Sequence, residues 1–224
     1  MNLNRLPKSK TVTRDRIRVV AETLFADNGI NGVTTRALAE TAGVNMAAVN
    51  YHFGNKDNLT IEVFRGAARR SAKRRIDSLQ AIEQIAKDQN RSPDIKDIIE
   101  AFVDAYLNDD DPRSGILLAH LVLKHRVAPT EWTRAVVRDE LDDLALRYVA
   151  ALQKAAPHLS EKATHWRYHL MVGAILVTLN DDGPESRINR LSGGLCSPAD
   201  RIEFRRELVS FLTSAFSKGA PTAR

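Results

Sequence analysis

Hydrophobic residues recur every three or four positions along most of the chain, a spacing that predicts helices. The clearest stripe lies near the N-terminus and has the spacing i, i+3, i+4, i+7 and i+8: Ile17, Val20, Ala21, Leu24 and Phe25. Gly29 is placed to end this helix in a left-handed conformation. No segment shows a convincing alternation of apolar and polar residues, so strands are not expected. The pattern therefore predicts an all-α protein.

The same periodicity predicts further helices over residues 35–42, 46–52, 56–79, 95–108, 113–126, 130–156, 161–180 and 199–218. Asp111-Pro112 is a good cap and first-turn pair for the helix over 113–126, and Pro157 ends the helix over 130–156. Residues 87–93 and the Gly- and Pro-rich stretch 182–198 are expected to be loops. No flexible linker is visible near residues 55–75, so the helix that begins at Lys56 should connect the N-terminal part rigidly to the rest.

Residues 33–53 predict two short helices joined by a tight turn. Thr34 can cap the first helix, and Val33 can pack onto Leu38 one turn later. Gly43 can adopt the positive φ that the turn needs, and the small Ala39 lets the helices cross closely. The residues expected to face the core are Leu38, Ala42, Val44, Val49 and Phe53. Those left partly outward on the second helix are Asn45, Met46, Ala47, Asn50, Tyr51 and His52. This is the geometry of a recognition helix that lies in the major groove.

The segment resembles the N-terminal part of the TetR family of transcription regulators. The matching pieces are Gly32-Val33-Thr34-Thr35, Ala39-Glu40-x-Ala42-Gly43-Val44, Tyr51-His52-Phe53 and Lys56-Asp57-x-Leu59. The motif covers about residues 14–60, and its spacing is specific. The resemblance implies an N-terminal three-helix helix-turn-helix DNA-binding domain, residues 1–60. It also implies a larger helical bundle, residues 61–224, for effector binding and dimerisation.

The resemblance further implies roles for single residues. The implied DNA-contacting set is Thr35, Arg36, Asn45, Met46, Ala47, Asn50, Tyr51, His52 and Lys56. Tyr51 and His52 correspond to side chains that lie against the DNA backbone, and Lys56 begins a helix whose N-terminus faces a phosphate. As hypotheses for base contacts, Asn45 and Asn50 could pair with adenine edges, and Ala47 or Ala48 could pack on thymine methyl groups.

Charge is unevenly distributed along the chain. Residues 1–75 carry 14 Lys and Arg against 6 Asp and Glu, whereas the remainder carries 19 against 22. A basic first third suits a polyanionic partner, although a solvated basic face would have the same composition. The basic N-terminal tail could reach into a minor groove or stay solvated: Arg5, Lys8, Lys10 and Arg14. A second cluster is interpreted as a solvated face of the connecting helix: Arg69, Arg70, Lys73, Arg74 and Arg75.

The C-terminal third contains two segments that favour an interface between two copies of the chain. Residues 170–179 are apolar or Gly except Thr178, so this helix should be covered on all sides. The last helix carries one apolar stripe: Phe204, Leu208, Phe211, Leu212 and Ala215. The two helices suit the four-helix dimer interface that the final helices form in the TetR family, and Gly173 and Ala174 would allow close approach. A buried core helix within one chain is the alternative.

The resemblance also implies a ligand pocket within the C-terminal bundle. The candidate lining residues are Phe102, Tyr106, Leu117, Leu121, Tyr148, Met171 and Ile175. Each of them could equally be plain core. The segments 157–160 and 166–170 look similar to regulators with acyl or other lipophilic effectors, which makes a lipophilic ligand one expectation.

Composition limits the remaining functions. Apolar residues make up 43% and charged residues 27%, as in ordinary globular proteins. The longest apolar run, 170–179, is too short for a membrane span of roughly 20 residues, and the N-terminus lacks the apolar region of a signal peptide. The single Cys196 cannot form an internal disulfide, which favours a cytoplasmic protein.

Metal and enzyme chemistry find little support in the sequence. His165 and His169 have an i, i+4 spacing that could hold a metal, but no third ligand is obvious, and ordinary histidines are the alternative. The acidic run 109–111 is interpreted as a solvated loop with a helix cap. No Gly-rich phosphate loop, nucleophile elbow or paired-Cys motif is present. We therefore expect neither a metal nor a cofactor, and not an enzyme.

The hypothesis is a homodimer that binds palindromic, double-stranded operator DNA and represses transcription until a small-molecule effector releases it. Activation is the open alternative for the sign of regulation. An effector can act in this way only if it prefers one conformation of the protein. The competing hypothesis is a helix-turn-helix protein that organises DNA or docks a protein partner without a small effector.

Overall fold

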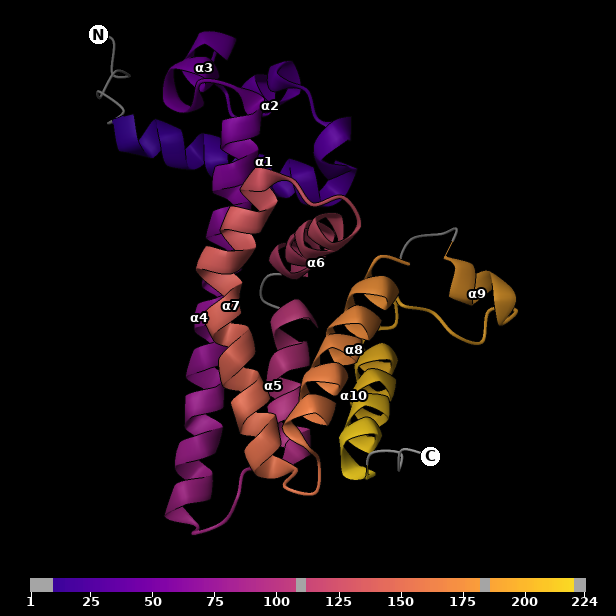
Figure 1. Ribbon diagram of the computed structural model, residues 1–224. Coiled ribbons are helices and arrows are strands. Elements are labelled where there is room, and N and C mark those ends of the chain that lie inside the picture. Colours follow the sequence, from indigo (N-terminus) through magenta and orange to yellow (C-terminus); the bar gives the residue numbers. More distant parts are fainter. Residues whose placement is uncertain (1–9, 108–111, 182–185, 220–224) are drawn as a thin grey trace, which may run out of the picture.

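The computed structural model describes residues 10–107, 112–181 and 186–219, and within these ranges the regular structure is entirely helical (Figure 1). The helices are α1 (Lys10–Gly32), α2 (Thr35–Thr41), α3 (Met46–Phe53), α4 (Lys56–Asp88), α5 (Ile95–Leu107), α6 (Pro112–Val127), α7 (Glu131–Ala155), α8 (Glu161–Leu179), α9 (Arg187–Leu191) and α10 (Arg201–Ser217). The predicted all-α class is therefore confirmed. Asp111, the predicted cap of α6, lies outside the described residues.

Helices α1, α2 and α3 form a head at one end of the long helix α4 (Figure 1). The apolar stripe of α1 supplies the core of this head, because Ile17, Ala21 and Phe25 are fully buried. Gly29 has φ 67° and ψ 164°, a conformation that interrupts α1 before its last residues. This break follows from the freedom of glycine at positive φ, and it lets the chain turn towards α2.

Helix α4 extends beyond its predicted end at residue 79 and continues to Asp88. The prediction ended this helix nine residues too early. Residues 80–88 contain no Gly or Pro, and they keep Ile82 half-buried and Ala86 buried. Helix-forming residues without a breaker continue an existing helix, since propagation costs much less than nucleation. One helix therefore runs from the head to the far end of the molecule.

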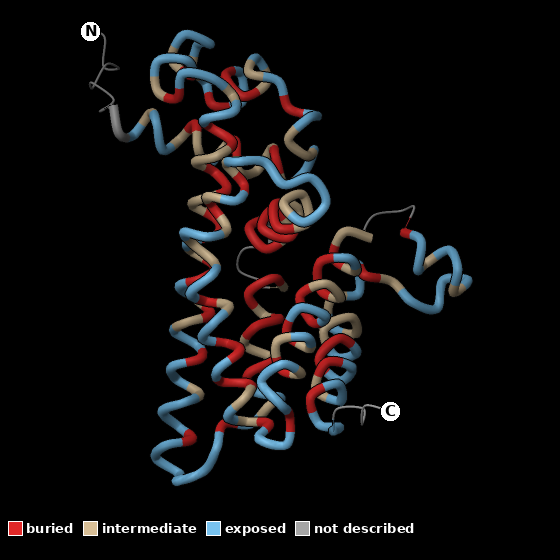
Figure 2. The backbone as a smooth tube through the Cα atoms, viewed as in Figure 1, coloured by how far each residue is buried: buried red, intermediate tan, exposed pale blue. Residues whose placement is uncertain are grey.

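Of the remaining helices, α5, α6 and α7 pack against α4, and α8 and α10 pack onto these. Helix α7 runs along α4, and α5 contacts both α4 and α10 (Figure 1). Helix α6 crosses the top of this bundle and contacts α1, α4, α5, α7 and α8. Its middle is buried, with Leu117, Leu118 and Leu121 all at or near zero exposure (Figure 2). The division between head and body at residue 60 falls inside α4, so the domain boundary stays a prediction.

Two segments near the C-terminus differ from the sequence expectation. The predicted loop 182–198 contains the short helix α9, which is capped by Ser186. The Asp181 carboxylate holds the start of this helix by accepting hydrogen bonds from the backbone amides of Arg187 and Ile188. The stripe predicted for α10 is divided within one chain. Leu208 and Leu212 are buried together with Phe216, whereas Phe211 is 64% exposed and so stays available for the predicted interface between two copies.

Helix α8 is also not covered on all sides within one chain. Met171, Ile175 and Leu179 are buried, whereas Leu170 and Val177 on the opposite face are exposed. An apolar helix in water is stable when both faces are covered, so the uncovered face of α8 is a candidate contact surface.

Candidate nucleic-acid interface and ligand cavity

The turn between α2 and α3 has the backbone that the sequence predicts. The Thr34 hydroxyl caps α2 by accepting a hydrogen bond from the Ala37 amide at 3.1 Å. Gly43 lies at φ 61°, the left-handed conformation that the tight turn requires. Asn45 caps α3, and its Oδ1 accepts a hydrogen bond from the Ala48 amide at 2.8 Å. These caps fix where the second helix begins.

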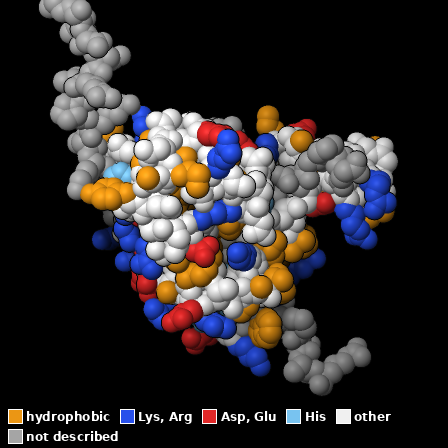
Figure 3. Space-filling model, turned by 90° about the horizontal axis from the view of Figure 1, so that it is seen from above, with side chains coloured by type: hydrophobic (Ala, Val, Ile, Leu, Met, Phe, Trp, Pro, Cys, Tyr) orange, Lys and Arg blue, Asp and Glu red, His pale blue; other side chains and the backbone are white. Residues whose placement is uncertain are grey.

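One face of α3 packs on the head and the other is open to solvent. Val49 and Phe53 are buried against α1 and α4, which leaves the opposite side of the helix uncovered. The residues of α3 and its cap that are exposed are Asn45, Met46, Ala47, Asn50 and Tyr51. Tyr51 is a large aromatic side chain with 66% of its surface exposed. Figure 3, which views the molecule from this end, shows Lys and Arg side chains beside hydrophobic ones on this face.

Several polar side chains of this face are already held by neighbours. The Arg36 guanidinium pairs with Glu40 at 2.8 Å within α2, and both side chains are largely exposed. The Lys56 ammonium donates to the Ile30 carbonyl at 2.6 Å, so it ties α4 to the end of α1. At the N-terminus of α4, Asn55 acts as the cap.

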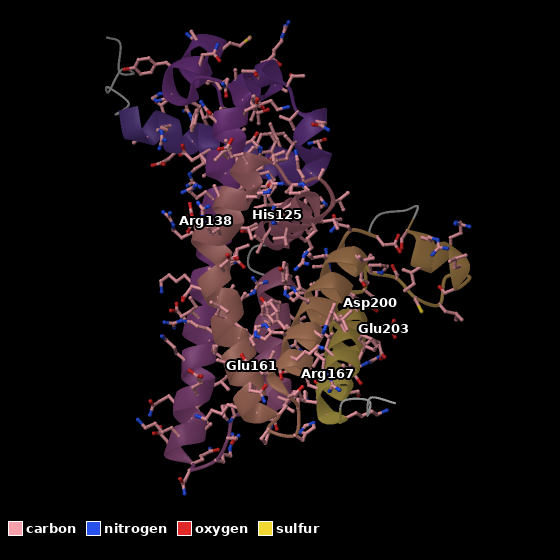
Figure 4. All side chains as sticks on the ribbon, in the orientation of Figure 1. His125, Arg138, Glu161, Arg167, Asp200 and Glu203 are labelled. Atoms are coloured by element: carbon pink, nitrogen blue, oxygen red, sulfur yellow. The ribbon has the colours of Figure 1, made fainter. Side chains whose placement is uncertain are left out.

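A cavity of about 280 Å³ lies under α6, where five helices meet. The side chains that give it its chemical character are Arg75 from α4, Phe102 and Tyr106 from α5, His125 from α6, and Tyr168 and His169 from α8. His125, labelled in Figure 4, comes from the C-terminal part of α6. Helix α7 contributes apolar side chains to the wall and the exposed carboxylate of Asp142.

Arg75 is buried, with 2% of its surface exposed, so its interpretation as part of a solvated face was wrong. Its guanidinium lies over the ring of Tyr106 at 4.1 Å and over the ring of Phe102 at 4.4 Å. Its Nε donates to the Phe102 carbonyl at 3.3 Å, and its Nη2 has no hydrogen-bond partner among the described residues. The helical repeat signals this position, because Arg75 follows Ala68 and Ala72 on the buried face of α4 and precedes Leu79.

Four titratable groups in or directly behind the cavity wall are shifted by their surroundings. Burial raises the pKa of the Tyr168 and Tyr148 hydroxyls far above the ordinary tyrosine value. Burial, followed by the positive charge of Arg126, lowers the pKa of His125 and His169. Both imidazoles are therefore mostly neutral at pH 7.

Two family models match the chain. The model described as bacterial regulatory proteins, tetR family, matches residues 17–63. The model described as tetracyclin repressor-like, C-terminal domain, matches residues 100–215, which is more than half of the chain. The chain belongs to the TetR family of bacterial regulatory proteins.

Two curated relatives of this TetR-family chain are transcriptional repressors. The repressor KstR2 of Mycolicibacterium smegmatis is 34% identical over 59 residues, which are 26% of this chain and 29% of the relative. The repressor AcnR of Corynebacterium glutamicum is 39% identical over 62 residues, which are 28% of this chain and 33% of the relative. The matches span about a third of the length of these relatives.

Solved structures share the fold over nearly the whole chain. A transcriptional regulator from Rhodococcus sp. Rha1 has a TM-score of 0.61 and 18% identity, and the match covers 94% of this chain and 99% of that one. The ketosteroid transcriptional regulator KstR2 of Mycobacterium tuberculosis has a TM-score of 0.57 and 16% identity, with 92% and 95% covered. At these identities the likeness shows the architecture of TetR-family regulators.

The predicted DNA-contacting residues of this TetR-family chain lie together on the head. The six exposed members are Arg36 of α2 and the five on α3 and its cap, whereas Thr35, His52 and Lys56 are half-buried. Their contacts with DNA stay predictions. The sequence could not separate a capping role of Asn45 from a base contact, because an asparagine side chain suits both.

The predicted ligand-lining residues are divided. Phe102 and Tyr106 line the cavity. Tyr148 lies directly behind them, with its ring 4.9 Å from that of Phe102 and its hydroxyl donating to the Arg75 carbonyl at 3.1 Å. The others are buried in the core and do not line this cavity: Leu117, Leu121, Met171 and Ile175. Sequence reasoning missed Arg75, His125 and His169 as lining residues, because its candidates were apolar or aromatic, and it also left out the aromatic Tyr168.

In the parts of the chain that the structure describes, no cluster of three or more His, Cys, Asp or Glu side chains could hold a metal ion. His165 is half-buried and His169 exposed on α8. The acidic run 109–111 lies outside the described residues. None of the described helices is both long and apolar enough to cross a membrane.

Proposed function

We propose that the chain is a cytoplasmic, dimeric repressor that binds a palindromic operator through α3 and leaves it when a small effector occupies the cavity under α6. The observation that carries this proposal is the outer face of α3. It is an exposed surface on a capped helix whose inner face is fully anchored. Such a helix fits the major groove, about 12 Å wide, and its length suits contacts over a few base pairs.

The proposed DNA contacts follow from exposure and chemistry. Asn50 is exposed and offers both a donor and an acceptor, as a bidentate contact to adenine requires. Met46 and Ala47 offer apolar contact for thymine methyl groups, and Tyr51 and His52 lie beside each other where a DNA backbone would pass. Thr35, Arg36, Asn45 and Lys56 complete the proposed contact set. The basic balance of residues 1–75 supports attraction to phosphates.

The proposed dimer uses the open apolar face of α8 and α10. Large hydrophobic side chains are exposed on one side of α8 and on the neighbouring α10: Trp166, Leu170, Val177 and Phe211. Exposed apolar side chains that gather on neighbouring helices favour an interface between proteins. A two-fold axis there would present two copies of α3 to half-sites about 34–36 Å apart, which is why the operator is proposed to be palindromic.

The proposed effector response depends on α6. This helix contributes Val122, His125 and Arg126 to the cavity wall and also packs against α1 of the head. A ligand that prefers one position of α6 would therefore shift the balance between head arrangements. An ion pair between Arg70 of α4 and Glu22 of α1 links the head to the long helix of the body.

Selection of bound fragments from sheared genomic DNA, at moderate salt, tests the proposal. We expect a palindromic sequence with half-sites about one helical turn apart. Fluorescence anisotropy on that sequence then compares wild type with Asn50→Ala, which should lose discrimination at one base pair worth about 1–3 kcal/mol. Gln80→Ala, an exposed polar position on the distal half of α4, is the matched control and should bind as wild type.

Other outcomes point to the competing hypothesis. Recovery of unrelated sequences, with binding that disappears as salt rises, indicates contacts to phosphates alone. The chain would then organise DNA or dock a protein partner. A selected palindrome whose binding is unchanged by Asn50→Ala, Met46→Ala and Arg36→Ala would contradict the proposed recognition surface while leaving the regulator intact.

A further inference from the structure

We propose that the cavity under α6 takes a small organic monoanion, a carboxylate on a compact apolar body, and that Arg75 is the residue that pairs with the carboxylate. The inference rests on the effector-controlled function proposed above and specifies the chemistry of its ligand.

Arg75 is the one buried charged residue in the part of the chain that the structure describes. A guanidinium removed from water is costly unless an anion or a full set of hydrogen bonds compensates it. No carboxylate pairs with Arg75 among the described ion pairs, and Nη2 is left without a hydrogen-bond partner. Such an unsatisfied buried donor in a folded protein requires an explanation, and its position on a cavity wall supplies one.

The surroundings of Arg75 hold its guanidinium in one orientation. The rings of Tyr106 and Phe102 lie against its face, and the Phe102 carbonyl accepts the hydrogen bond from Nε. An arginine stacked in this way keeps its plane fixed. Its Nη2 is covered by neighbouring atoms as well as unpartnered, so a ligand in the cavity has to displace part of this cover to pair with it. A planar carboxylate matches the edge of a guanidinium through charge-assisted hydrogen bonds, which are about twice as strong as neutral ones.

The charge balance of the cavity favours a single negative charge. His125 and His169 are mostly neutral at pH 7, because burial and Arg126 lower their pKa values. The other two charged lining residues, Arg126 and Asp142, are exposed and of opposite sign. One buried cation compensates one carboxylate, whereas a phosphate monoester would bring up to two negative charges and leave part of that charge uncompensated.

The rest of the cavity sets the body of the ligand. Apart from the groups already named, the wall is apolar, with Val122, Leu144 and Val172 among its side chains. A volume of about 280 Å³ is near the lower end of ordinary ligand pockets, which span about 300–1,000 Å³. The ligand is therefore a compact aromatic or short aliphatic acid.

A larger hollow between α5 and α10 is also lined by an arginine, but this arginine is already paired. Its volume is about 690 Å³, and Arg205 lines it. Arg205 is already satisfied, because its Nε and Nη2 bind the two oxygens of Asp104 at 2.6 and 2.9 Å. An arginine with a bidentate protein partner does not require a ligand, so the unpaired Arg75 identifies the cavity under α6 instead.

Thermal unfolding of the full chain with matched pairs of acids and amides tests the proposal. The probes are 3-phenylpropanoate with 3-phenylpropanamide, hexanoate with hexanamide, and phenyl phosphate, each at 10 mM and constant ionic strength. We expect at least one carboxylate to raise Tm by about 3–5 °C, as ligand at ten times its Kd would. The amides and phenyl phosphate should raise it by less than a third of that shift.

Arg75→Met should abolish the carboxylate shift, and Arg75→Lys should retain part of it because a point charge remains without the planar fork. Arg74→Met is the matched control, since Arg74 is the neighbouring arginine on α4 but does not line the cavity. It should respond to the carboxylate as wild type does. Circular dichroism of each variant without ligand checks that it is folded. If Arg75→Met does not fold, the comparison of Arg75→Lys with wild type still tests the proposal.

Three outcomes would overturn the proposal: equal shifts from acids and amides, a larger shift from phenyl phosphate, or no shift from any carboxylate. DNA binding by the same samples separates this proposal from the function above. Operator binding without any carboxylate response would leave the repressor standing and reject the anion site. A carboxylate shift that depends on Arg75 but leaves operator binding unchanged would support the site and reject effector release.

Discussion

The Arg75 guanidinium lies 4.1 Å from the centre of the Tyr106 ring, so a charged residue of α4 and an aromatic residue of α5 share one buried contact. Tyr148 of α7 joins the same cluster by donating a hydrogen bond to the Arg75 carbonyl. Three helices therefore meet at Arg75, and the groups that face its positive charge are aromatic rings, where a carboxylate would be usual. The rings offset only part of the cost of burying the guanidinium, because a cation over an aromatic ring gains about 0.5–2 kcal/mol.

Without ligand, Arg75→Met should leave the protein as stable as wild type or more stable by about 1–2 kcal/mol. Replacing a buried charge by an apolar side chain of similar length removes its desolvation cost, while methionine keeps favourable contact with the rings. Urea unfolding at a fixed protein concentration measures the change. A loss of more than 1 kcal/mol would indicate that the rings and the Phe102 carbonyl compensate the guanidinium fully.

Gly115→Ala should destabilise the protein by about 3 kcal/mol. A Cβ at this position would lie 2.1 Å from the Tyr106 carbonyl oxygen, so α5 and α6 would have to separate next to the cavity. Gly66→Ala in α4 is the control. Its Cβ would meet only the ends of two side chains, Arg70 Nη1 at 3.3 Å and Arg18 Nη1 at 3.8 Å, and removing a helical glycine should add about 0.5–1 kcal/mol. Equal effects of the two substitutions would contradict the close α5–α6 contact.

The helices and the turn of the head could be predicted because local rules determine them. The cap at Thr34 and the glycine turn at Gly43 act within four residues of themselves. The cavity could not be predicted in the same way, because its residues come from five helices. Arg75 shows the difference most clearly: its helical position indicates burial, but only the packed bundle shows the rings that make burial tolerable. Which part of the α10 stripe is buried within one chain likewise depends on how α5 and α8 meet this helix.

Substitutions at Asn45 should separate helix capping from DNA binding. Asn45→Asp keeps the acceptor that caps α3, so stability should change by less than about 0.5 kcal/mol, while its negative charge weakens operator binding. Asn45→Ala removes the cap and should lower the free energy of unfolding by about 1 kcal/mol. Urea unfolding and anisotropy on the same samples measure both effects. Full operator affinity in Asn45→Asp would exclude this position from the DNA contact surface.

Stability should fall as pH decreases from 7.5 through about 6.5, the ordinary histidine pKa. The pKa values of His125 and His169 are lowered in the folded state, so the unfolded chain binds protons more readily in this range and protonation favours unfolding. Below the lowered values both states are protonated, and the loss is complete. The groups around them are Arg126, Arg134, Asp142 and His165. Tm measured against pH should vary less in a His125→Gln/His169→Gln variant; an unchanged profile would contradict the assignment.

Charges placed on the open face of α8 and α10 should separate the proposed dimer. Leu170 and Phe211 are 67% and 64% exposed in the single chain, and a two-fold interface would bring each new charge near its own copy. Light scattering on Leu170→Glu/Phe211→Glu should give the mass of one chain, 24.9 kDa, where wild type gives twice that value. Operator affinity should fall with it, because one head then binds one half-site. Leu146→Glu is the control: Leu146 is 62% exposed on α7, a helix outside the proposed interface, and its variant should stay dimeric. If the double variant keeps the dimer mass while Leu146→Glu loses it, the interface lies on α7 and the proposed arrangement of the two heads is wrong.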